Sequence, residues 1–392
     1  MTAQPISSSL ANQILGRFET KQSEIESFIR ALVEVESPSG DLAGSRAVVD
    51  LVASAAGNLA CVDAVERVDV PEFGQHLVVK AFQQQHSAGQ ILLVGHTDTV
   101  HSLGSLAERP WRREGNKIYG PGIFDMKANA ALAIEILRAL SELDLKPQCG
   151  VSLVLTCDEE VGSTSGWPLI ERVAKEQRTN YAFVLEPPAS GGRVKTGRKG
   201  TGMYAIKVEG KAAHAGLEPE KGASAILELA RQTERLHALN LAGSGITLNV
   251  GVVHGGTRSN VVAAYAEGEI DVRFSTEAES REIERILATL EPVDERTKVF
   301  VSGGINRPPL ERTAAVVELF AKARGIAAAL GFELGEAQVG GASDGNFIAA
   351  MGIPVLDGLG INGDGAHAVH EHIEADDIAR RGALITGLLL SV

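Results

Sequence analysis

Cysteine is scarce in this 392-residue sequence, which contains only Cys61, Cys149 and Cys157, widely spaced and without a C-x-x-C pair. An odd and sparse set of this kind argues against a disulfide framework and against a zinc site built from thiolates. Cys157 follows the apolar run LVLT, so we expect a small buried strand residue there rather than a reactive thiol.

Basic residues and long apolar runs are also in short supply. The 37 Lys and Arg residues stand against 50 Asp and Glu, which gives a net charge of -13. This balance argues against nucleic acid or an anionic membrane as the main partner. The apolar stretches, such as GALITGLLLSV, are too short to span a membrane, and the first twenty residues lack the features of a signal peptide. We therefore expect a soluble, cytoplasmic protein.

Apolar runs and helical patterns alternate along the first half of the chain. Strands are predicted at HLVVKAF, ILLVG, VSLVLTC and YAFVLE, and residues 126–145 have the apolar spacing of a long helix. Alternation of strands with helices is typical of a sheet covered by helices on both faces. The sequence thus predicts an α/β fold with a mixed or parallel central sheet.

The pattern changes after residues 186–202, a stretch rich in Pro, Gly and Ser that is typical of a linker. A strand, a helix, two strands, a helix and a strand follow, an order typical of a small ferredoxin-like α+β unit. A second linker-like stretch, SGGINRPPL, precedes a return to the first pattern. We therefore predict a larger domain in two pieces, 1–197 and 310–392, with a smaller domain inserted at 198–309.

Histidines and carboxylates stand where the predicted strands end or where the long helix begins. They are His96 and Asp98 after ILLVG, Asp125 before the helix, Glu159 and Glu160 after VSLVLTC, Glu186 after YAFVL, and His367 after IPVLDGLGI. Ligands of open α/β sheets bind at the carboxyl ends of the strands, so these side chains are expected at one edge. Each motif alone also fits a solvated loop, but the ordered set favours a metal site, because gathered carboxylates repel one another without a cation. Imidazole and carboxylate ligands suit zinc, and also cobalt or manganese.

Six segments occur in a characteristic order: GHTDTV, YGPGIFDMKAN, CDEEVGSTSG, VLEPP, GRKGTGMYAIKVEGKAAHAG and GGASDGNF…GDGAHAVHEHI. Together they resemble the di-zinc aminoacylase/carboxypeptidase family, with the carboxypeptidase G branch the most similar in style. The resemblance covers the chain from about Ile25 to its end. It implies a catalytic metallopeptidase domain with two Zn²⁺ per chain, an inserted dimerisation or lid domain, and a homodimer.

The resemblance also implies roles for the matching positions. Asp125 would bridge two metal ions, with His96 and Glu186 on one ion and Glu160 and His367 on the other. Asp98 would orient His96 or a nearby group. Glu159 would act as the general base, taking a proton from the attacking water and returning it to the leaving nitrogen.

Residues of the inserted domain complete the candidate site. By the same resemblance, His214 would stabilise the oxyanion across a dimer interface, and an exposed loop histidine is the alternative. Asn260 and Arg273 would bind the substrate carboxylate, to which the planar fork of arginine is well matched. Arg258 and Arg307 are further candidates, and each also fits a solvated linker arginine.

These features predict a metal-dependent hydrolase that cleaves an amide bond to an amino acid with a free carboxylate. Release of C-terminal glutamate from small peptides or N-acyl amino acids is favoured by the resemblance alone. Glu186 supports that branch, because many deacylases of the family have Asp at the matching position. Two alternatives stay open: a deacylase of the acetylornithine deacetylase or succinyl-diaminopimelate desuccinylase type, and a non-catalytic homologue that binds a small molecule.

Overall fold

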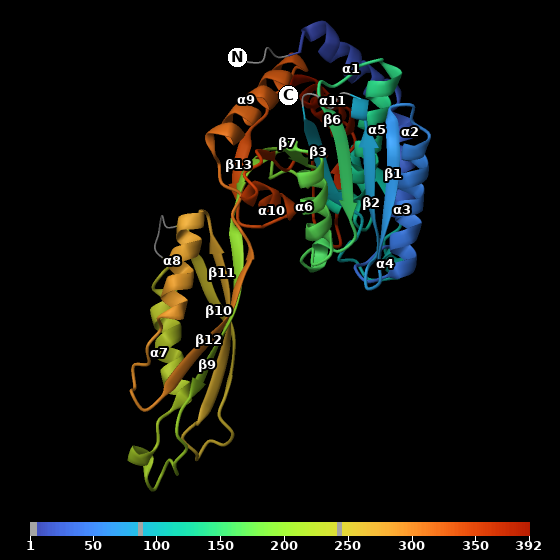
Figure 1. Ribbon diagram of the computed structural model, residues 1–392. Helices are drawn as coiled ribbons and strands as arrows, with labels where there is room; N and C mark the ends of the chain where they lie inside the picture. Colours follow the sequence, from blue (N-terminus) through green and yellow to red (C-terminus); the bar gives the residue numbers. More distant parts are fainter. Residues whose placement is uncertain (1–5, 85–88, 241–244) are drawn as a thin grey trace. The chain divides into compact units, whose positions relative to one another are not determined.

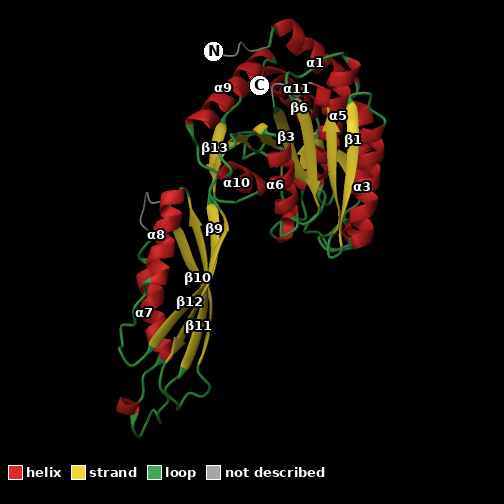
Figure 2. Ribbon diagram, viewed as in Figure 1, coloured by secondary structure: helices red, strands yellow, loops and turns green. Residues whose placement is uncertain are grey.

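The chain forms two compact units in the computed structural model, which describes residues 6–84, 89–240 and 245–392. Unit 1 comprises Met1–Thr196, Arg312–Gln338 and Ser343–Val392, and unit 2 comprises Gly197–Glu311 and Val339–Ala342. Residues 1–5, with which the larger predicted domain begins, lie outside the described residues. Figures 1 and 2 show the helices and strands of each unit.

Unit 1 is built on a six-stranded central sheet. Its strands are β1 (Val62–Val70), β2 (Gly74–Ala81), β3 (Gln90–His96), β6 (Gly150–Thr156), β7 (Thr179–Val184) and β14 (Val355–Leu356). They lie in the order β1-β2-β6-β3-β7-β14; β6, β3, β7 and β14 are parallel to one another, and β2 is antiparallel to both of its neighbours, β1 and β6. Every residue of β3 and β6 is buried, which explains why these strands are continuous apolar runs. The predicted mixed central sheet is confirmed.

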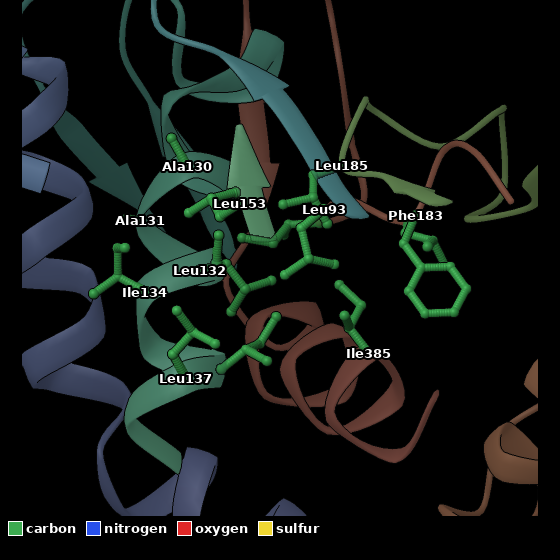
Figure 3. Packing of buried hydrophobic residues seen from close by; sticks show 14 of the residues in the cluster. Leu93, Ala130, Ala131, Leu132, Ile134, Leu137, Leu153, Phe183, Leu185 and Ile385 are labelled. Atoms are coloured by element: carbon green, nitrogen blue, oxygen red, sulfur yellow. The ribbon is translucent and has the colours of Figure 1, made fainter. Parts of the chain in front are cut away.

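Helices cover both faces of this sheet. The helices of unit 1 are α1 (Ser8–Thr20), α2 (Gln22–Val33), α3 (Leu42–Gly57), α4 (Ser105–Glu108), α5 (Ala128–Glu142), α6 (Gly166–Glu176), α9 (Ala314–Ala329), α10 (Asp344–Ala350) and α11 (Asp377–Ser391). On one face, Leu93 and Leu153 pack with Leu132 of α5 and Ile385 of α11 (Figure 3). Residues of α6 and α10 contact the strands but stand outside that core, so these helices cover the other face. Within the part of the chain that the structure describes, no helix combines the length and apolar character that a membrane crossing needs.

Two small sheets lie outside the central one. One has the order β15-β16-β5-β4, with β4 (Arg112–Glu114), β5 (Lys117–Tyr119), β15 (Gly363–Asp364) and β16 (His372–Glu374). The other pairs β8 (Val194–Arg198) with β13 (Glu336–Val339). The expectation that residues 186–202 form a linker is therefore wrong for their second half, where Val194 and Thr196 are buried in a strand. Pro187, Pro188, Gly191 and Gly192 precede β8, whereas Gly197 lies within it and Gly200 and Gly202 lie in the strand that follows.

Unit 2 pairs an antiparallel sheet with two helices. It contains β9 (Gly200–Glu209), η4 (Pro219–Lys221), α7 (Ala225–His237), β10 (Thr247–Gly255), β11 (Tyr265–Phe274), α8 (Glu277–Ala288) and β12 (Lys298–Arg307). The strand order is β10-β11-β9-β12, and the chain order is the predicted β-α-β-β-α-β. Ala266, Ile270 and Val272 of β11 are buried with residues of α7 and α8, whereas the alternate residues Glu267, Glu269 and Asp271 are more exposed. This alternation is typical of a sheet with helices on one face.

Candidate metal centre

Parallel strands of unit 1 bring three of the predicted ligands to one edge of the central sheet. His96 is the last residue of β3 and pairs in register with Thr156, the last residue of β6. Glu160 lies in the short turn η3 (Glu159–Val161) that follows β6, and Glu186 follows β7. The strand pattern therefore predicts this part of the site directly, because the carboxyl ends of parallel strands meet at one edge.

Loops supply the other two predicted ligands. Asp125 lies in η2 (Ile123–Lys127), a π-helical turn before α5, where Asp125 itself has non-helical backbone angles. His367 lies between β15 and β16 and has a φ of 64°, which is uncommon for a residue other than glycine. Such a conformation costs about 1–3 kcal/mol and is concentrated at functional sites.

The two carboxylate oxygens of Asp125 face two different histidines. Oδ1 lies 3.2 Å from His96 Nε2, and Oδ2 lies 3.4 Å from His367 Nε2. Glu186 Oε1 lies 3.6 Å from His96 Nε2, and Glu160 Oε2 lies 3.2 Å from His367 Nε2. Two groups of three potential ligands result, each with its ligand atoms within 4.8 Å of one another, and Asp125 belongs to both.

The chemistry of this cluster fits a pair of divalent cations. Oε1 of Glu160 is buried and has no hydrogen-bond partner among the residues that the structure describes. Burial raises the pKa of Glu160, and the charges of Asp125 and Glu159 raise it further. A cation at this position would remove the repulsion and give the buried oxygen a partner. Carboxylate oxygens with imidazole nitrogens are ligands for zinc, cobalt or manganese.

The hydrogen bonds within the cluster shift the pKa values of its two histidines and of Asp125. Hydrogen bonds to Asp125 and Glu160 raise the pKa of His367 to about 10. Burial alone would lower the pKa of His96, but hydrogen bonds to Asp125 and Asp98 outweigh burial and raise it well above its usual value. Burial would raise the pKa of Asp125, yet its hydrogen bonds with both histidines hold it well below the usual range. The carboxylates of the cluster thus favour the protonated histidines, and the histidines favour the ionised form of Asp125.

Asp98 connects the end of β3 to the loop that carries the two glutamates. Nδ1 of His96 donates to the backbone oxygen of Asp98 at 3.0 Å, which turns Nε2 toward Asp125. The Asp98 carboxylate accepts from the backbone N–H groups of Glu159 and Glu160 at 3.2 and 3.1 Å. Since Asp98 is buried, these bonds fix the orientation of the histidine and the position of the glutamates together.

His214 and Asn260 lie close together on neighbouring loops of unit 2. The backbone oxygen of Asn260 accepts from Ala215 N at 3.0 Å, and His214 forms an isolated bridge with Val261. Both side chains are exposed, as is Arg258. Exposure fits a loop histidine and also fits a group that reaches a second molecule.

Arg273 and Arg307 lie at the opposite end of the same sheet. Both pair with Thr201 at the start of β9, whereas His214 comes after the far end of that ten-residue strand, which spans about 30 Å at about 3.3 Å per residue. One chain therefore does not bring Asn260 and Arg273 to the same small ligand. Arg307 is buried, which contradicts the alternative of a solvated arginine at that position.

The guanidinium of Arg273 already has an acidic partner. It donates from Nε and Nη2 to the two carboxylate oxygens of Asp271, at 2.8 and 2.9 Å. Both residues are partly exposed on β11. A substrate carboxylate at Arg273 would therefore compete with Asp271 or share the guanidinium with it.

Several buried residues near the centre were not among the sequence candidates. His76 of β2 accepts from Cys157 N at 3.1 Å, and its Nε2 lies 3.1 Å from Ser165 Oγ, which supports the segment that leads to Glu159. A lone histidine in a strand gives no signal of this role. Glu371 is also buried, and it stands only four residues after the predicted ligand His367, so a position near the site could have been predicted for it from the sequence. Cys157 is buried as predicted, and burial raises the pKa of its thiol to about 12.

Comparison with known proteins places the chain in a family. The model of "Peptidase family M20/M25/M40" matches residues 92–391. The chain is similar to carboxypeptidase G2 from Pseudomonas sp., with 28% identity over 382 residues that cover 95% of this chain and 90% of the relative. It is also similar to succinyl-diaminopimelate desuccinylase from Delftia acidovorans, with 29% identity over 308 residues, 74% of this chain and 78% of that protein.

Solved structures share the fold. Aminopeptidase PepT from Bacillus cereus superposes with a TM-score of 0.77 at 22% identity, covering 94% of this chain and 98% of that one. YXEP from Bacillus subtilis, described as a dinuclear metal-binding peptidase, superposes with a TM-score of 0.71 at 14% identity, covering 95% and 98%. The family match extends through the strand ends and loops that carry His96, Asp125, Glu160, Glu186 and His367. The chain belongs to peptidase family M20/M25/M40 and is a metallohydrolase of that family.

Proposed function

We propose that this metallohydrolase is a dinuclear carboxypeptidase that releases C-terminal glutamate from small peptides or N-acyl amino acids. The observation that carries the proposal is the position of Asp125, whose two oxygens face His96 and His367 separately. A carboxylate in this position is suited to bridge two cations. The similarity to carboxypeptidase G2 across 95% of the chain favours glutamate as the released residue.

Two ions would be held by two ligand groups that share one carboxylate. His96, Asp125 and Glu186 form the first group, and Asp125, Glu160 and His367 form the second. Zinc is the first candidate, with cobalt or manganese as alternatives. When bound, the ions supply a water molecule of lowered pKa and polarise the amide carbonyl.

Glu159 is proposed as the proton carrier of the reaction. Its backbone N–H is held by Asp98, and its carboxylate adds to the charge that raises the pKa of Glu160, so the two glutamates are close neighbours in the site. The carboxylate takes a proton from the attacking water and returns it to the leaving amide nitrogen. General acid–base help of this kind contributes about 10²–10⁴-fold to the rate.

Substrate recognition is proposed to need two copies of the chain. His214 would stabilise the oxyanion, and Asn260, Arg273 and Arg307 would bind the carboxylate that marks a C-terminal residue. Asn260 and Arg273 lie at opposite ends of one sheet, so both contact the same substrate only if a second chain supplies one of them. This separation supports the homodimer expected from the sequence. The cytoplasmic location stays a prediction.

A deacylase of the succinyl-diaminopimelate desuccinylase type is the second candidate. The similarity to that enzyme, 29% identity across 74% of the chain, favours it. Both candidates cleave an amide bond in a substrate with a free carboxylate. They differ in the acyl group on one side of that bond and in the amino acid on the other.

Metal analysis combined with a substrate panel would separate the candidates. The panel contains N-acyl amino acids and dipeptides with C-terminal Glu, neutral or basic residues, together with N-acetyl and N-succinyl diamino acids. Two ions per chain and chelator-sensitive release of glutamate are the expected results. Turnover of the N-acyl diamino acids alone would establish the deacylase. Bound metal without turnover of any substrate would contradict both and leave a small-molecule-binding protein.

A further inference from the structure

We propose that Glu371 is a positioning residue that fixes the bridging carboxylate of Asp125, and that His101 holds Glu371 in place. The inference rests on the proposed dinuclear centre and deepens it. None of the ligand assignments uses either residue. Both are buried, so their polar groups depend on protein partners.

The carboxylate of Glu371 collects the backbone donors of the turn that carries Asp125. Oε1 accepts from Phe124 N at 2.8 Å and from Asp125 N at 3.0 Å. Oε2 accepts from Gly122 N at 2.8 Å and from the ring nitrogen Nε2 of His101. Three amides of one turn thus converge on a single carboxylate, an arrangement that defines where the backbone of Asp125 lies.

The turn requires an external acceptor because its own backbone is irregular. Asp125 and Met126 have non-helical angles inside η2, and Gly122 has a φ of 69°. The N–H groups at the start of a helix lack acceptors within the helix. Glu371 is the acceptor for these donors before α5, so its position determines the direction from which Asp125 enters the metal site.

His101 fixes the other side of Glu371. Nη2 of Arg109 lies 3.5 Å from Nδ1 of His101, so the guanidinium donates to Nδ1 and the ring proton stays on Nε2. That proton is the one donated to Glu371. Arg109 thus orients His101, and His101 orients Glu371. In many metal sites a second residue orients a metal-binding side chain in this way; here Glu371 orients the backbone turn that carries Asp125.

One short segment of chain therefore contacts Asp125 from two directions. His367 Nε2 lies 3.4 Å from Asp125 Oδ2, while Glu371, four residues later, accepts from Asp125 N. Between them, Glu371 N donates to Ala368 O at 3.3 Å, which closes the segment into a turn. We expect the two contacts together to set the separation of the two metal sites.

The variant Glu371→Gln tests this role with almost no change in shape. An amide nitrogen replaces one carboxylate oxygen and faces backbone N–H groups as a second donor. Zinc titration by calorimetry measures affinity and stoichiometry, and electron paramagnetic resonance of the cobalt-loaded protein measures coupling between two ions. We expect the weaker zinc site to lose about 10–100-fold in affinity, with reduced cobalt coupling. Two zinc ions bound with wild-type affinities and unchanged coupling would overturn the proposal.

Glu228→Gln in unit 2 is the matched control. Glu228 is fully buried and accepts from Val293 N and Asp294 N at 2.8 and 3.0 Å, but it belongs to neither ligand group. This control should lower the unfolding temperature without changing zinc affinity. If Glu371→Gln does the same, its role is purely structural and the proposal fails.

A pair of variants at His101 keeps the test available if Glu371→Gln does not fold. His101→Gln retains an N–H donor at similar reach, whereas His101→Ala removes it. We expect weaker zinc binding in His101→Ala and recovery in His101→Gln; equal, wild-type binding in both would reject the role of His101 and Glu371. Wild-type protein that binds fewer than two ions would instead reject the dinuclear centre itself, so the two failures are distinguishable.

Discussion

Replacing Glu159 should separate proton transfer from metal binding. The Glu159 side chain is in neither ligand group, and the bond from its backbone N–H to Asp98 is available to Gln or Ala as well. We therefore expect Glu159→Gln and Glu159→Ala to retain two metal ions and an unfolding free energy within about 0.5 kcal/mol of wild type.

The expected loss lies in turnover. General acid–base help of about 10²–10⁴-fold corresponds to about 2.7–5.4 kcal/mol of transition-state stabilisation at 1.36 kcal/mol per decade. Because the substrate contacts are intact, kcat should fall by this factor while KM changes little. Steady-state kinetics on a glutamate-releasing substrate checks the expected loss of kcat, and metal content measured on the same samples checks that both ions are retained.

Glu160→Gln is the matched control, one residue along the chain. Glu160 Oε2 lies 3.2 Å from His367 Nε2, so this variant should lose affinity for one ion as well as activity. The reasoning is refuted if Glu159→Ala keeps near-normal kcat, or if both variants lose the same amount of metal.

Three further predictions follow from the remaining geometry. Because hydrogen bonds to Asp125 and Glu160 raise the pKa of His367 from 6.5 to about 10, they stabilise the metal-free fold below pH 6.5 and this stabilisation is lost as the pH rises through about 10. Zinc must displace that proton, so binding near pH 7 should release protons and tighten as the pH rises; calorimetry in buffers of different ionisation enthalpy measures this, and zero net release would contradict it. Burial raises the pKa of Cys157 to about 12, so native protein treated with iodoacetamide at pH 8 should show no label at this position by mass spectrometry, whereas urea-unfolded protein should be labelled. Leu93 of β3 is fully buried in the core that also contains residues of α5 and α11, so Leu93→Ala should lower the unfolding free energy by about 2–5 kcal/mol in urea titration, and a loss below 1 kcal/mol would contradict the packing.

The sequence predicted best those parts of the molecule that depend on local pattern. Fully buried strands such as β3 and β6 are continuous apolar runs, and the polar residues predicted at their ends, His96 and Glu160, each lie in one of the two ligand groups. The strands of unit 2 could be predicted equally well, because buried and exposed residues alternate along them where one face of the sheet is buried under α7 and α8. In these cases the pattern of apolar residues along the sequence is sufficient to predict the strand and the side of it that is buried.

Elements that depend on tertiary contacts were not predicted. β1 is a half-exposed strand whose residues VDAVERVDV pair with β2 without a continuous apolar run. The strands β15 and β16 are two and three residues long; β15 pairs with β16, and β16 pairs with β5, so both depend on contacts between distant segments. The separation of Asn260 from Arg273 depends on strand direction and register in unit 2, which motif matching along a sequence does not supply.

The position of Asp125 between two histidines depends on both local pattern and tertiary contacts. Asp125 lies in an irregular turn, so neither the end of a strand nor the spacing of a helix predicts the direction in which its carboxylate points. In the proposed arrangement the direction of this carboxylate depends on Glu371, which lies 246 residues later in the chain and accepts from Asp125 N. Yet Glu371 stands four residues after His367, whose ring faces the same carboxylate. The spacing of four residues between His367 and Glu371 therefore allows one short turn to contact Asp125 twice. An insertion or deletion in that turn should displace the candidate ligand His367 and also the acceptor that holds the backbone of Asp125.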